Sequence, residues 1–195
     1  MEEKLKQEPS DIIKIVMFGP ESTGKTTLAQ ALAAHYNTKW VPEYAREYLQ
    51  EKWNREQKTC EPKDLIPIAE GQIFLENKLT KQANKILFCD TDLLETKVYS
   101  EAYYLGNCDP ILEKYAVENT YNLYFLTYID VPWEKDDLRD KPEEREEMFD
   151  YFKNTLDTYN KSYVLLKGDF ENRMKTAINH VEKLIQENDN TYGNR

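Results

Sequence analysis

The feature that most constrains the fold is an eight-residue segment after the first apolar run of the chain. Residues 19–26 are Gly-Pro-Glu-Ser-Thr-Gly-Lys-Thr and match the pattern G-x-x-x-x-G-K-[S/T] in full. The apolar run 12–18 precedes this segment, and an Ala- and Leu-rich run with helical spacing follows it. This order of strand, glycine loop and helix predicts a phosphate-binding loop. The alternative is a plain glycine turn with Thr as helix cap, which would not require the lysine.

Each residue type in this loop has a chemical reason. Gly19 and Gly24 permit backbone conformations and a close approach that a Cβ atom would obstruct. The N–H groups of the loop and the positive end of the following helix bind phosphate oxygens. We therefore expect Lys25 to contact the β- and γ-phosphates of ATP, and Thr26 to ligate Mg²⁺. The expected nucleotide-binding residues are Gly19, Glu21, Ser22, Thr23, Gly24, Lys25, Thr26 and Thr27.

Apolar runs alternate with helical patterns along the rest of the chain. Runs that are apolar on both faces predict buried parallel strands, here at 12–18, 39–41, 86–89, 123–129 and 163–166. Helices are expected at 26–36, 68–77, 91–104 and 174–185. The pattern predicts one α/β domain over residues 1–195, with helices around a parallel sheet and an ordered core of about residues 11–186. The polar ends, 1–10 and 186–195, are expected to be disordered.

A second apolar run ends in two acidic residues. Residues 86–89 are Ile-Leu-Phe-Cys, and Asp90, Thr91 and Asp92 follow them. In enzymes with a phosphate-binding loop, a carboxylate at this place holds Mg²⁺, usually through water. We therefore expect Asp90 to be a metal ligand and Asp92 to face the metal or the substrate. Either carboxylate could instead cap the helix that begins nearby, and the two roles can hold at once.

The segment after the first helical pattern carries further polar residues. Residues 41–48 are Val-Pro-Glu-Tyr-Ala-Arg-Glu-Tyr. Because ligands bind beyond the carboxyl ends of parallel strands, Glu43 is expected beside the phosphate-binding loop. There it could take the proton of an attacking hydroxyl group, while Arg46 could bind the acceptor or the developing phosphoryl charge. Tyr44 and Tyr48 are expected to flank the same crevice. The alternative is an exposed Glu43–Arg46 pair on a helix surface.

Residues 133–151 are dense in charge and poor in core-forming side chains, which predicts an exposed, mobile insertion. We expect a lid over about residues 133–148, in which Arg139 and Arg145 close over the transferring phosphoryl group and exclude water. The alternative is a solvated charge run. After the last strand, Asp169 could lie beneath an adenine ring, but a cap of the final helix is the favoured interpretation.

The overall charge limits the partners. The 26 Lys and Arg residues against 36 Asp and Glu residues give a net charge of −10, which argues against a basic face for a nucleic-acid duplex. No apolar run approaches the roughly 18–20 residues of a membrane span, and the charged start carries no apolar signal core. The cysteines, Cys60, Cys89 and Cys108, lack C-x-x-C spacing. We therefore expect a cytoplasmic protein that binds a small molecule, and neither nucleic acid nor a membrane.

Several of these motifs together resemble the ribosylnicotinamide (nicotinamide riboside) kinase family of the P-loop NTPase superfamily, including the kinase domain of bacterial NAD-biosynthesis regulators. The resemblance extends over about residues 12–185. The motifs that carry it are residues 19–26, the segment Glu-Tyr-Ala-Arg-Glu-Tyr at 43–48, Gly71-Gln72, Asp-Thr-Asp at 90–92, Asp-Leu-Arg at 137–139, and Arg145.

This resemblance implies transfer of the γ-phosphate of ATP to the 5′-hydroxyl of nicotinamide riboside, which gives nicotinamide mononucleotide. It also implies a three-layer P-loop kinase fold with a five-stranded parallel sheet of order 2-3-1-4-5. The chain is too short to contain the adenylyltransferase and DNA-binding domains of those regulators as well. The kinase step alone is therefore expected.

The expected catalytic residues are Lys25, Glu43, Asp92, Arg139 and Arg145, with Glu43 and Asp92 both open as the base. The expected acceptor-binding residues are Glu43, Tyr44, Arg46, Tyr48 and Asp92; aromatic rings and carboxylates would attract the cationic pyridinium of nicotinamide riboside. Two alternatives remain at this point. One is a kinase of another nucleoside or nucleotide, and the other is a regulatory ATP-binding or ATPase module. The sequence does not give the oligomeric state.

Overall fold

The structure, a computed structural model, describes residues 2–134 and 144–193. At its centre lies a five-stranded sheet in which all strands are parallel. The strands, in chain order, are β1 (Ile13–Phe18), β2 (Trp40–Val41), β3 (Ile86–Asp90), β4 (Leu123–Thr127) and β5 (Tyr163–Leu166). Their order in the sheet is β2-β3-β1-β4-β5, which confirms the order 2-3-1-4-5.

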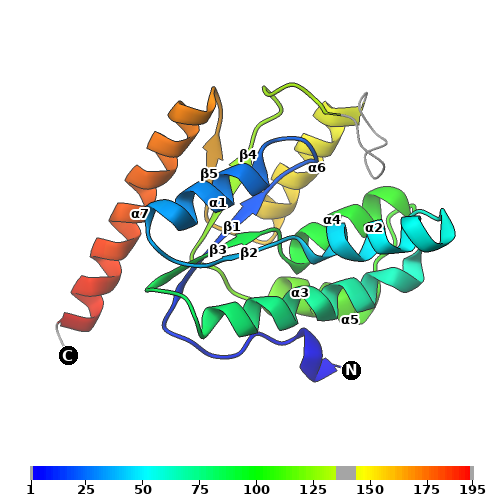
Figure 1. The fold of residues 1–195 in the computed structure, drawn as a ribbon, viewed down its shortest axis with the longest axis horizontal. Coiled ribbons are helices and arrows are strands. Elements are labelled where there is room, and N and C mark those ends of the chain that lie inside the picture. Colours follow the sequence, from blue (N-terminus) through cyan, green and yellow to red (C-terminus); the bar gives the residue numbers. More distant parts are fainter. Residues whose placement is uncertain (1, 135–143, 194–195) are drawn as a thin grey trace.

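Helices cover both faces of this sheet and give three layers (Figure 1). The helices α1 (Lys25–His35) and α7 (Phe170–Gly193) pack on one face. The opposite face carries α3 (Leu65–Thr80), α4 (Leu93–Tyr103), α5 (Pro110–Glu118) and α6 (Arg145–Thr158), and α2 (Tyr44–Glu56) packs on α3. Short 3-10 helices, η1 (Glu2–Leu5) and η2 (Pro62–Asp64), precede β1 and α3.

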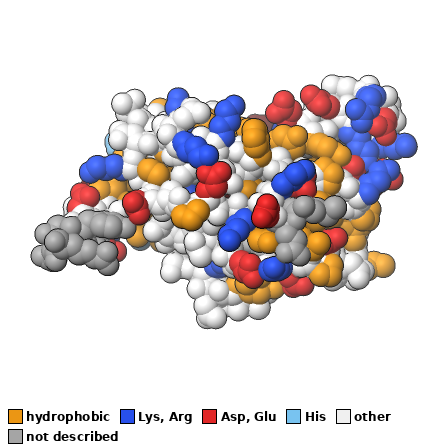
Figure 2. All heavy atoms as spheres, turned by 90° about the horizontal axis from the view of Figure 1, so that it is seen from below, with side chains coloured by type: hydrophobic (Ala, Val, Ile, Leu, Met, Phe, Trp, Pro, Cys, Tyr) orange, Lys and Arg blue, Asp and Glu red, His pale blue; other side chains and the backbone are white. Residues whose placement is uncertain are grey.

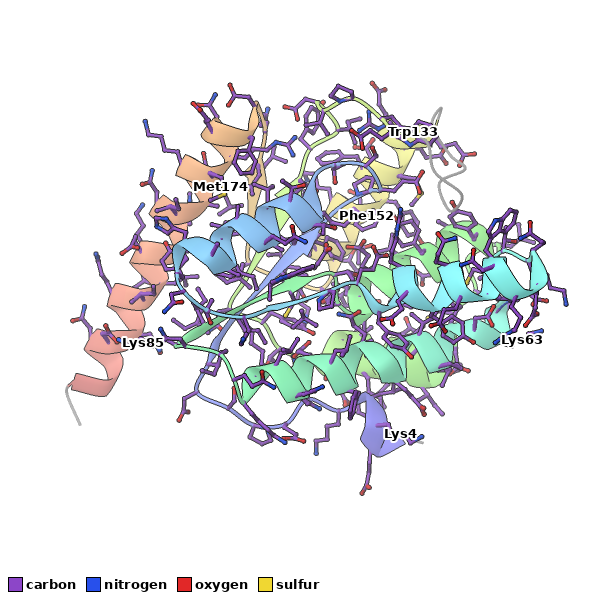
Figure 3. All side chains as sticks on the ribbon, in the orientation of Figure 1. Lys4, Lys63, Lys85, Trp133, Phe152 and Met174 are labelled. Atoms are coloured by element: carbon purple, nitrogen blue, oxygen red, sulfur yellow. The ribbon has the colours of Figure 1, made fainter. Side chains whose placement is uncertain are left out.

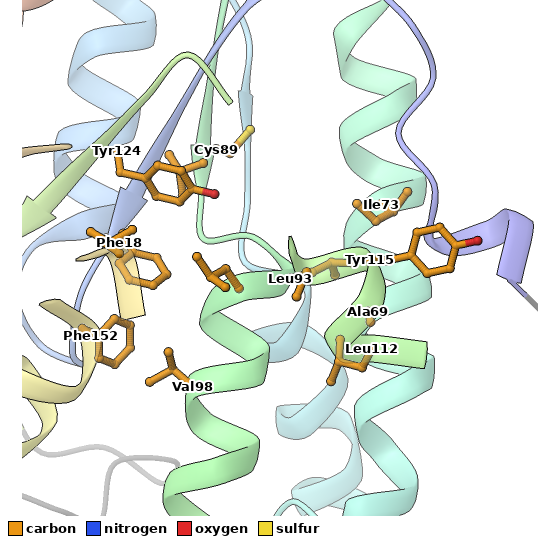
Figure 4. Packing of buried hydrophobic residues seen from close by; sticks show 14 of the residues in the cluster. Phe18, Ala69, Ile73, Cys89, Leu93, Val98, Leu112, Tyr115, Tyr124 and Phe152 are labelled. Atoms are coloured by element: carbon orange, nitrogen blue, oxygen red, sulfur yellow. The ribbon is translucent and has the colours of Figure 1, made fainter. Parts of the chain in front are cut away.

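The central strand β1 shows why the sheet needs a helical layer on each face. Its side chains alternate between the two sides, with Ile15 and Met17 in the core under α1 and α7, and Val16 and Phe18 in the opposite core. The Phe18 ring packs edge-on against Tyr124 of β4 and Phe152 of α6, at centroid distances of 5.4 and 4.8 Å (Figure 4). Burying each large apolar side chain contributes about 1.5–3 kcal/mol, so both layers stabilise the sheet.

The expected disorder of the two ends is wrong for most of their residues. Leu5, the last residue of η1, is fully buried between α3 and α5. The amide of Gln7 donates to Glu76 of α3 at 2.8 Å, and Asn77 accepts the N–H of Glu8 at 2.9 Å. At the other end, α7 continues to Gly193. One apolar residue anchors the first segment, and helix propagation from an already formed helix extends the last.

The expected mobile insertion at 133–151 is also shorter than the charge pattern suggests. Residues 145–151 form the first two turns of α6, which buries Met148 and Phe149 against the core. Most of the charged residues lie on the outer face of this helix, so its apolar stripe is not apparent in the charge-dense sequence. The central part of the predicted lid, 135–143, lies outside the described residues.

Two surface properties bear on the kind of partner. Acidic and basic side chains intermingle over much of the face shown in Figure 2. Within the described ranges, no helix combines the length and apolar character that a membrane span needs.

Candidate active site

The phosphate-binding loop leaves β1 at a point where the sheet leaves no room for a side chain. Gly19 has φ 141°, and a Cβ atom there would lie 2.6 Å from Oγ1 of Thr127 and 2.9 Å from its backbone oxygen. Gly24, at the start of α1, has φ 83°, which is also in the left-handed region. Both glycines are therefore required by the backbone, as expected from the loop pattern.

Lys25 begins α1 and points back into the loop. Its Nζ donates to the backbone oxygens of Gly19 at 2.6 Å and Pro20 at 3.0 Å, and lies 3.1 Å from a carboxylate oxygen of Glu95. Burial lowers the pKa of this ammonium, but Glu95 and the other nearby carboxylates more than offset the effect and hold the pKa above its usual value. Lys25 is therefore positively charged at neutral pH although it is buried.

Thr26 and Asp90 form the candidate magnesium site. Because β1 and β3 are neighbours in the sheet, with Met17 opposite Asp90, the end of β3 lies beside the start of α1. Thr26 donates its hydroxyl to Oδ2 of Asp90 at 2.5 Å, while the buried Oδ1 has no hydrogen-bond partner among the described residues. Burial, with Glu43 adding to it, raises the pKa of Asp90 to about 6.

This donor set fits Mg²⁺, which prefers hard oxygen ligands and keeps several waters. The hydroxyl of Thr26 and the orphaned oxygen of Asp90 are two such donors. In the described part of the chain, no group of three or more His, Cys, Asp or Glu side chains could hold a metal on its own. The remaining ligands would therefore be water and phosphate oxygens.

A cavity of about 530 Å³ opens beside the loop. Its walls come from the phosphate-binding loop, the start of α2, the segment before η2, α3, α4, the segment after β4 and the start of α7. The described residues that line the cavity include Glu21, Ser22, Thr23, Gly24, Lys25, Thr26, Thr27, Glu43, Arg46, Gln72, Glu95, Tyr99, Tyr103, Phe170 and Arg173.

Glu43 is held in this cavity by its neighbours in the chain. It is the residue before α2, and Gln72 of α3 binds the backbone on both sides of it. Oε1 of Gln72 accepts the N–H of Tyr44 at 2.8 Å, and Nε2 donates to the carbonyl of Pro42 at 3.3 Å. Gln72 is only 2% exposed, so water does not compete for this two-point clamp.

Tyr44 and Tyr48, expected from the sequence to flank the crevice, are not among the residues that line the cavity. Tyr44 packs on Gly71 of α3, and Tyr48 donates its hydroxyl to Asp64 at 3.2 Å. The helical period explains this correction, because α2 turns the side of Arg46 and Leu49 to the cavity and the side of the tyrosines to α3.

Asp92 is likewise absent from the cavity wall. It caps α4 by accepting the N–H of Glu95 at 3.0 Å, and it accepts the hydroxyl of Tyr124 at 2.7 Å. Burial raises its pKa to about 6. Thr91 has φ 78° and turns the chain between the two carboxylates, so that Asp90 approaches Thr26 while Asp92 faces Tyr124.

The described parts of the predicted lid lie on the phosphate-binding loop. Arg145 donates to the carbonyls of Val131 at 3.0 Å and Ser22 at 3.2 Å, and its buried Nε has no partner among the described residues. Trp133 donates to Glu21 at 3.3 Å and lies on the segment after β4, at the same edge of the molecule as the loop (Figure 3). Arg139 lies outside the described residues.

The sequence profile of a family described as an AAA domain matches residues 14–173. The chain belongs to this family. It is 27% identical over 183 residues to the trifunctional NAD biosynthesis/regulator protein NadR of Escherichia coli (strain K12), and equally to that of Salmonella typhimurium. Each alignment covers 92% of this chain and 44% of the relative, so the chain spans less than half the length of the curated relatives that it matches.

Solved structures show the same likeness. The crystal structure of NadR protein in complex with NR superposes with a TM-score of 0.76 at 26% identity, covering 89% of this chain and 51% of that chain. The structure of NadR in complex with NAD and AMP-PNP gives 0.72 at 26% identity, with 89% and 49% covered. Deoxyadenosine kinase from M. mycoides gives 0.65 at 14% identity, with 88% and 100% covered, which shows a shared fold. The expected P-loop kinase fold is confirmed.

Three residues of the site carry no recognisable sequence signal of their own role. Glu95 lies in an ordinary amphipathic helix, and only the family resemblance points to Gln72. Arg173 of α7 is 2% exposed and donates to the carbonyls of Thr23, Tyr128 and Gly168, which ties the phosphate-binding loop to the ends of β4 and β5. Nearby, Asp169 accepts the N–H of Asn172 at 2.9 Å and is the helix cap that was favoured.

Proposed function

We propose that this protein is a kinase that transfers the γ-phosphate of ATP to the 5′-hydroxyl of nicotinamide riboside and gives nicotinamide mononucleotide. One observation carries the proposal. The fold that holds the loop, Glu43 and the cavity superposes over 89% of this chain on NadR protein solved in complex with NR, which we take as nicotinamide riboside. NadR of Escherichia coli (strain K12) is named as a NAD biosynthesis/regulator protein, which supports the same chemistry.

Different residues of the chain have different roles in this reaction. The loop N–H groups and Lys25 bind the β- and γ-phosphates and neutralise their charge. Glu43, held by Gln72, orients the 5′-hydroxyl and takes its proton. The hydroxyl oxygen then forms a bond to the γ-phosphorus as the bond from this phosphorus to the β–γ bridging oxygen breaks, and ADP leaves with that oxygen.

Thr26 and Asp90 are proposed to hold Mg²⁺, which when bound supplies positive charge against the phosphate oxygens. Arg145 already contacts the loop, and its Nε, which has no partner among the described residues, is proposed to donate to the γ-phosphate. Arg139 is proposed to join it from the lid. Arg46 lines the acceptor side of the cavity and is proposed to bind the acceptor's hydroxyl groups.

Purified protein, Mg·ATP and nicotinamide riboside test the proposal directly. We expect formation of ADP and nicotinamide mononucleotide in equal amounts, followed by coupled absorbance and by mass spectrometry. A panel of other nucleosides and nucleotides belongs in the same assay. Preference for another acceptor would replace the substrate, and ATP hydrolysis that no acceptor accelerates would favour a regulatory ATPase.

The role of the loop is tested by Lys25→Ala. We expect a fall in turnover of several orders of magnitude with the fold intact by circular dichroism, because the substitution removes the charge that faces the phosphates. Lys39→Ala, which removes an exposed lysine before β2, is the matched control and should behave like wild type. Activity of Lys25→Ala at the wild-type level would remove the loop from the mechanism.

A further inference from the structure

Glu95, in the first helical turn of α4, is a buried carboxylate for which the described residues supply no aligned hydrogen-bond donor. Its side chain is 3% exposed and lines the cavity. Among the described residues, neither oxygen accepts a hydrogen bond in aligned geometry, although Nζ of Lys25 lies 3.1 Å from Oε1. Buried polar groups are nearly always hydrogen-bonded, and a buried carboxylate without donors is costly. The position therefore suits a ligand that brings hydrogen-bond donors.

The helix fixes where such a ligand would lie. Asp92 caps α4 through the N–H of Glu95 and so holds the backbone of this residue in place. Tyr99 and Tyr103 follow at helical spacings of four and eight residues, and all three side chains line the cavity. Along α4 the cavity wall thus presents a carboxylate beside the phosphate-binding loop and then two aromatic rings. A nucleoside has the same order, with sugar hydroxyl groups next to the phosphate acceptor and the base beyond them.

Lys25 and Glu95 are paired only as long as Lys25 points into its own loop. The ammonium group donates to the carbonyls of Gly19 and Pro20 and forms an ion pair with Glu95 at 3.1 Å. To contact the β- and γ-phosphates of ATP, Lys25 must turn away from these partners. Burial raises the pKa of Glu95 well above its usual value, and Lys25 opposes this rise. Once Lys25 turns away, Glu95 stays ionised only where donors from another molecule stabilise its carboxylate.

We propose that Glu95 is a second acceptor-binding carboxylate, whose contact with Lys25 is given up when Lys25 turns to the phosphates of ATP. Glu95 then accepts hydrogen bonds from the sugar hydroxyl groups of the acceptor, while Glu43 acts on the 5′-hydroxyl. Nucleotide and acceptor consequently strengthen each other's binding, because one Lys25 side chain cannot serve both partners. This inference rests on the proposed kinase function and names a residue that binds its acceptor.

Binding measurements separate this role from a merely structural one. Isothermal titration calorimetry of the full chain would measure nicotinamide riboside binding with and without a non-hydrolysable ATP analogue and Mg²⁺. For wild type we expect tighter acceptor binding with the analogue present. For Glu95→Gln we expect acceptor affinity in the presence of the analogue to fall roughly 10- to 100-fold, the usual effect of losing hydrogen bonds to a charged group. Analogue affinity should stay equal or become tighter, since Lys25 is no longer held back.

Two further variants serve as controls for this test. Glu95→Asp keeps the charge beside Lys25 but withdraws it from the cavity, so it should fold like wild type and still weaken acceptor binding. Glu118→Gln makes the same chemical change at an exposed site at the end of α5 and should leave both affinities unchanged. Thermal unfolding of each variant shows whether the fold is retained.

The inference is overturned if both Glu95 variants bind the acceptor like wild type, or if Glu95→Gln weakens the analogue as much as the acceptor. The latter result would mean that Glu95 only positions Lys25. If wild type itself neither binds nor phosphorylates nicotinamide riboside, the proposed function fails. The analogue arm still decides the Lys25–Glu95 exchange in that case, because weaker analogue binding by Glu95→Gln overturns it and equal or tighter binding supports it.

Discussion

The substitution Gly71→Ala adds one methyl group to α3 and tests how Glu43, the proposed base, is positioned. A Cβ atom there would lie 2.1 Å from Cε1 and 2.3 Å from Cδ1 of Tyr44. Ordinary van der Waals contact begins at 3.4 Å, so the ring must move by about 1.3 Å. Because Gln72 binds Tyr44 and Pro42 on either side of Glu43, this displacement reaches the carboxylate that we propose as the base.

We predict that Gly71→Ala lowers the free energy of unfolding by about 1–3 kcal/mol, the usual cost of overpacking. In a chain of this length, such a loss lowers Tm by roughly 2–12 °C. Helix propensity alone would raise stability by about 0.5–1 kcal/mol, so a net loss must come from the contact with Tyr44. A misplacement of about 1 Å costs roughly 100-fold in rate, and we expect a fall in kcat of that order. Affinity for an ATP analogue should stay close to wild type.

Thermal unfolding, steady-state kinetics and a double-mutant cycle with Tyr44→Ala measure these effects. Removal of the ring makes room for the new methyl group, so Gly71→Ala should cost much less in the Tyr44→Ala background than in wild type. Additive losses in the cycle would mean that the ring is not what the methyl group meets. If Gly71→Ala alone had the Tm and kcat of wild type, the Tyr44 ring would move aside without loss of stability or rate. This result would refute the reasoning.

Two further predictions concern the polar networks around the site. Arg173→Lys keeps the positive charge but loses the guanidinium group that binds three backbone carbonyls. We expect the free energy of unfolding, measured in urea, to fall by about 2–4 kcal/mol, and binding of an ATP analogue, measured by calorimetry, to weaken. An unchanged unfolding midpoint would contradict this prediction. Hydrogen bonds from Lys52 and Lys63 lower the pKa of Glu61 from 4.5 to about 2. These pairs therefore stabilise the fold above about pH 4.5, and this stabilisation is lost as the pH falls towards 2. Lys52→Met should flatten the fall of Tm between about pH 5 and pH 3, and a pH dependence identical to wild type would argue against the network.

Two of the helices that the sequence missed, α2 and α6, lack an apolar pattern that can be recognised in the sequence. In α2 the single buried residue is Lys52, since one side of the helix lines the cavity, and so no apolar stripe marks it. In α6 the stripe exists but lies within a charge-dense run. Leu5 shows the same limit at the N-terminal end, because one apolar residue in a polar segment gives no periodicity, although tertiary contacts bury it completely.

What the sequence determined by itself is local. The glycine loop and the strands β1, β3 and β5, each to within about a residue, follow from motifs and periodicities within a few residues of each position. The direction of a side chain two or three residues beyond a strand is not local. Asp92 and Tyr44 stand next to the right strand ends, yet they face Tyr124 and Gly71 instead of the cavity.

Only the tertiary structure decided which buried polar groups meet. Gln72 binds the backbone of Pro42, 30 residues away, and Arg173 binds the backbone of Thr23 across 150 residues. Glu95 meets Lys25 because α4 packs beside the loop. The energy of a buried charge depends on its partners and on its exposure. The residues next to it in the sequence determine neither of these.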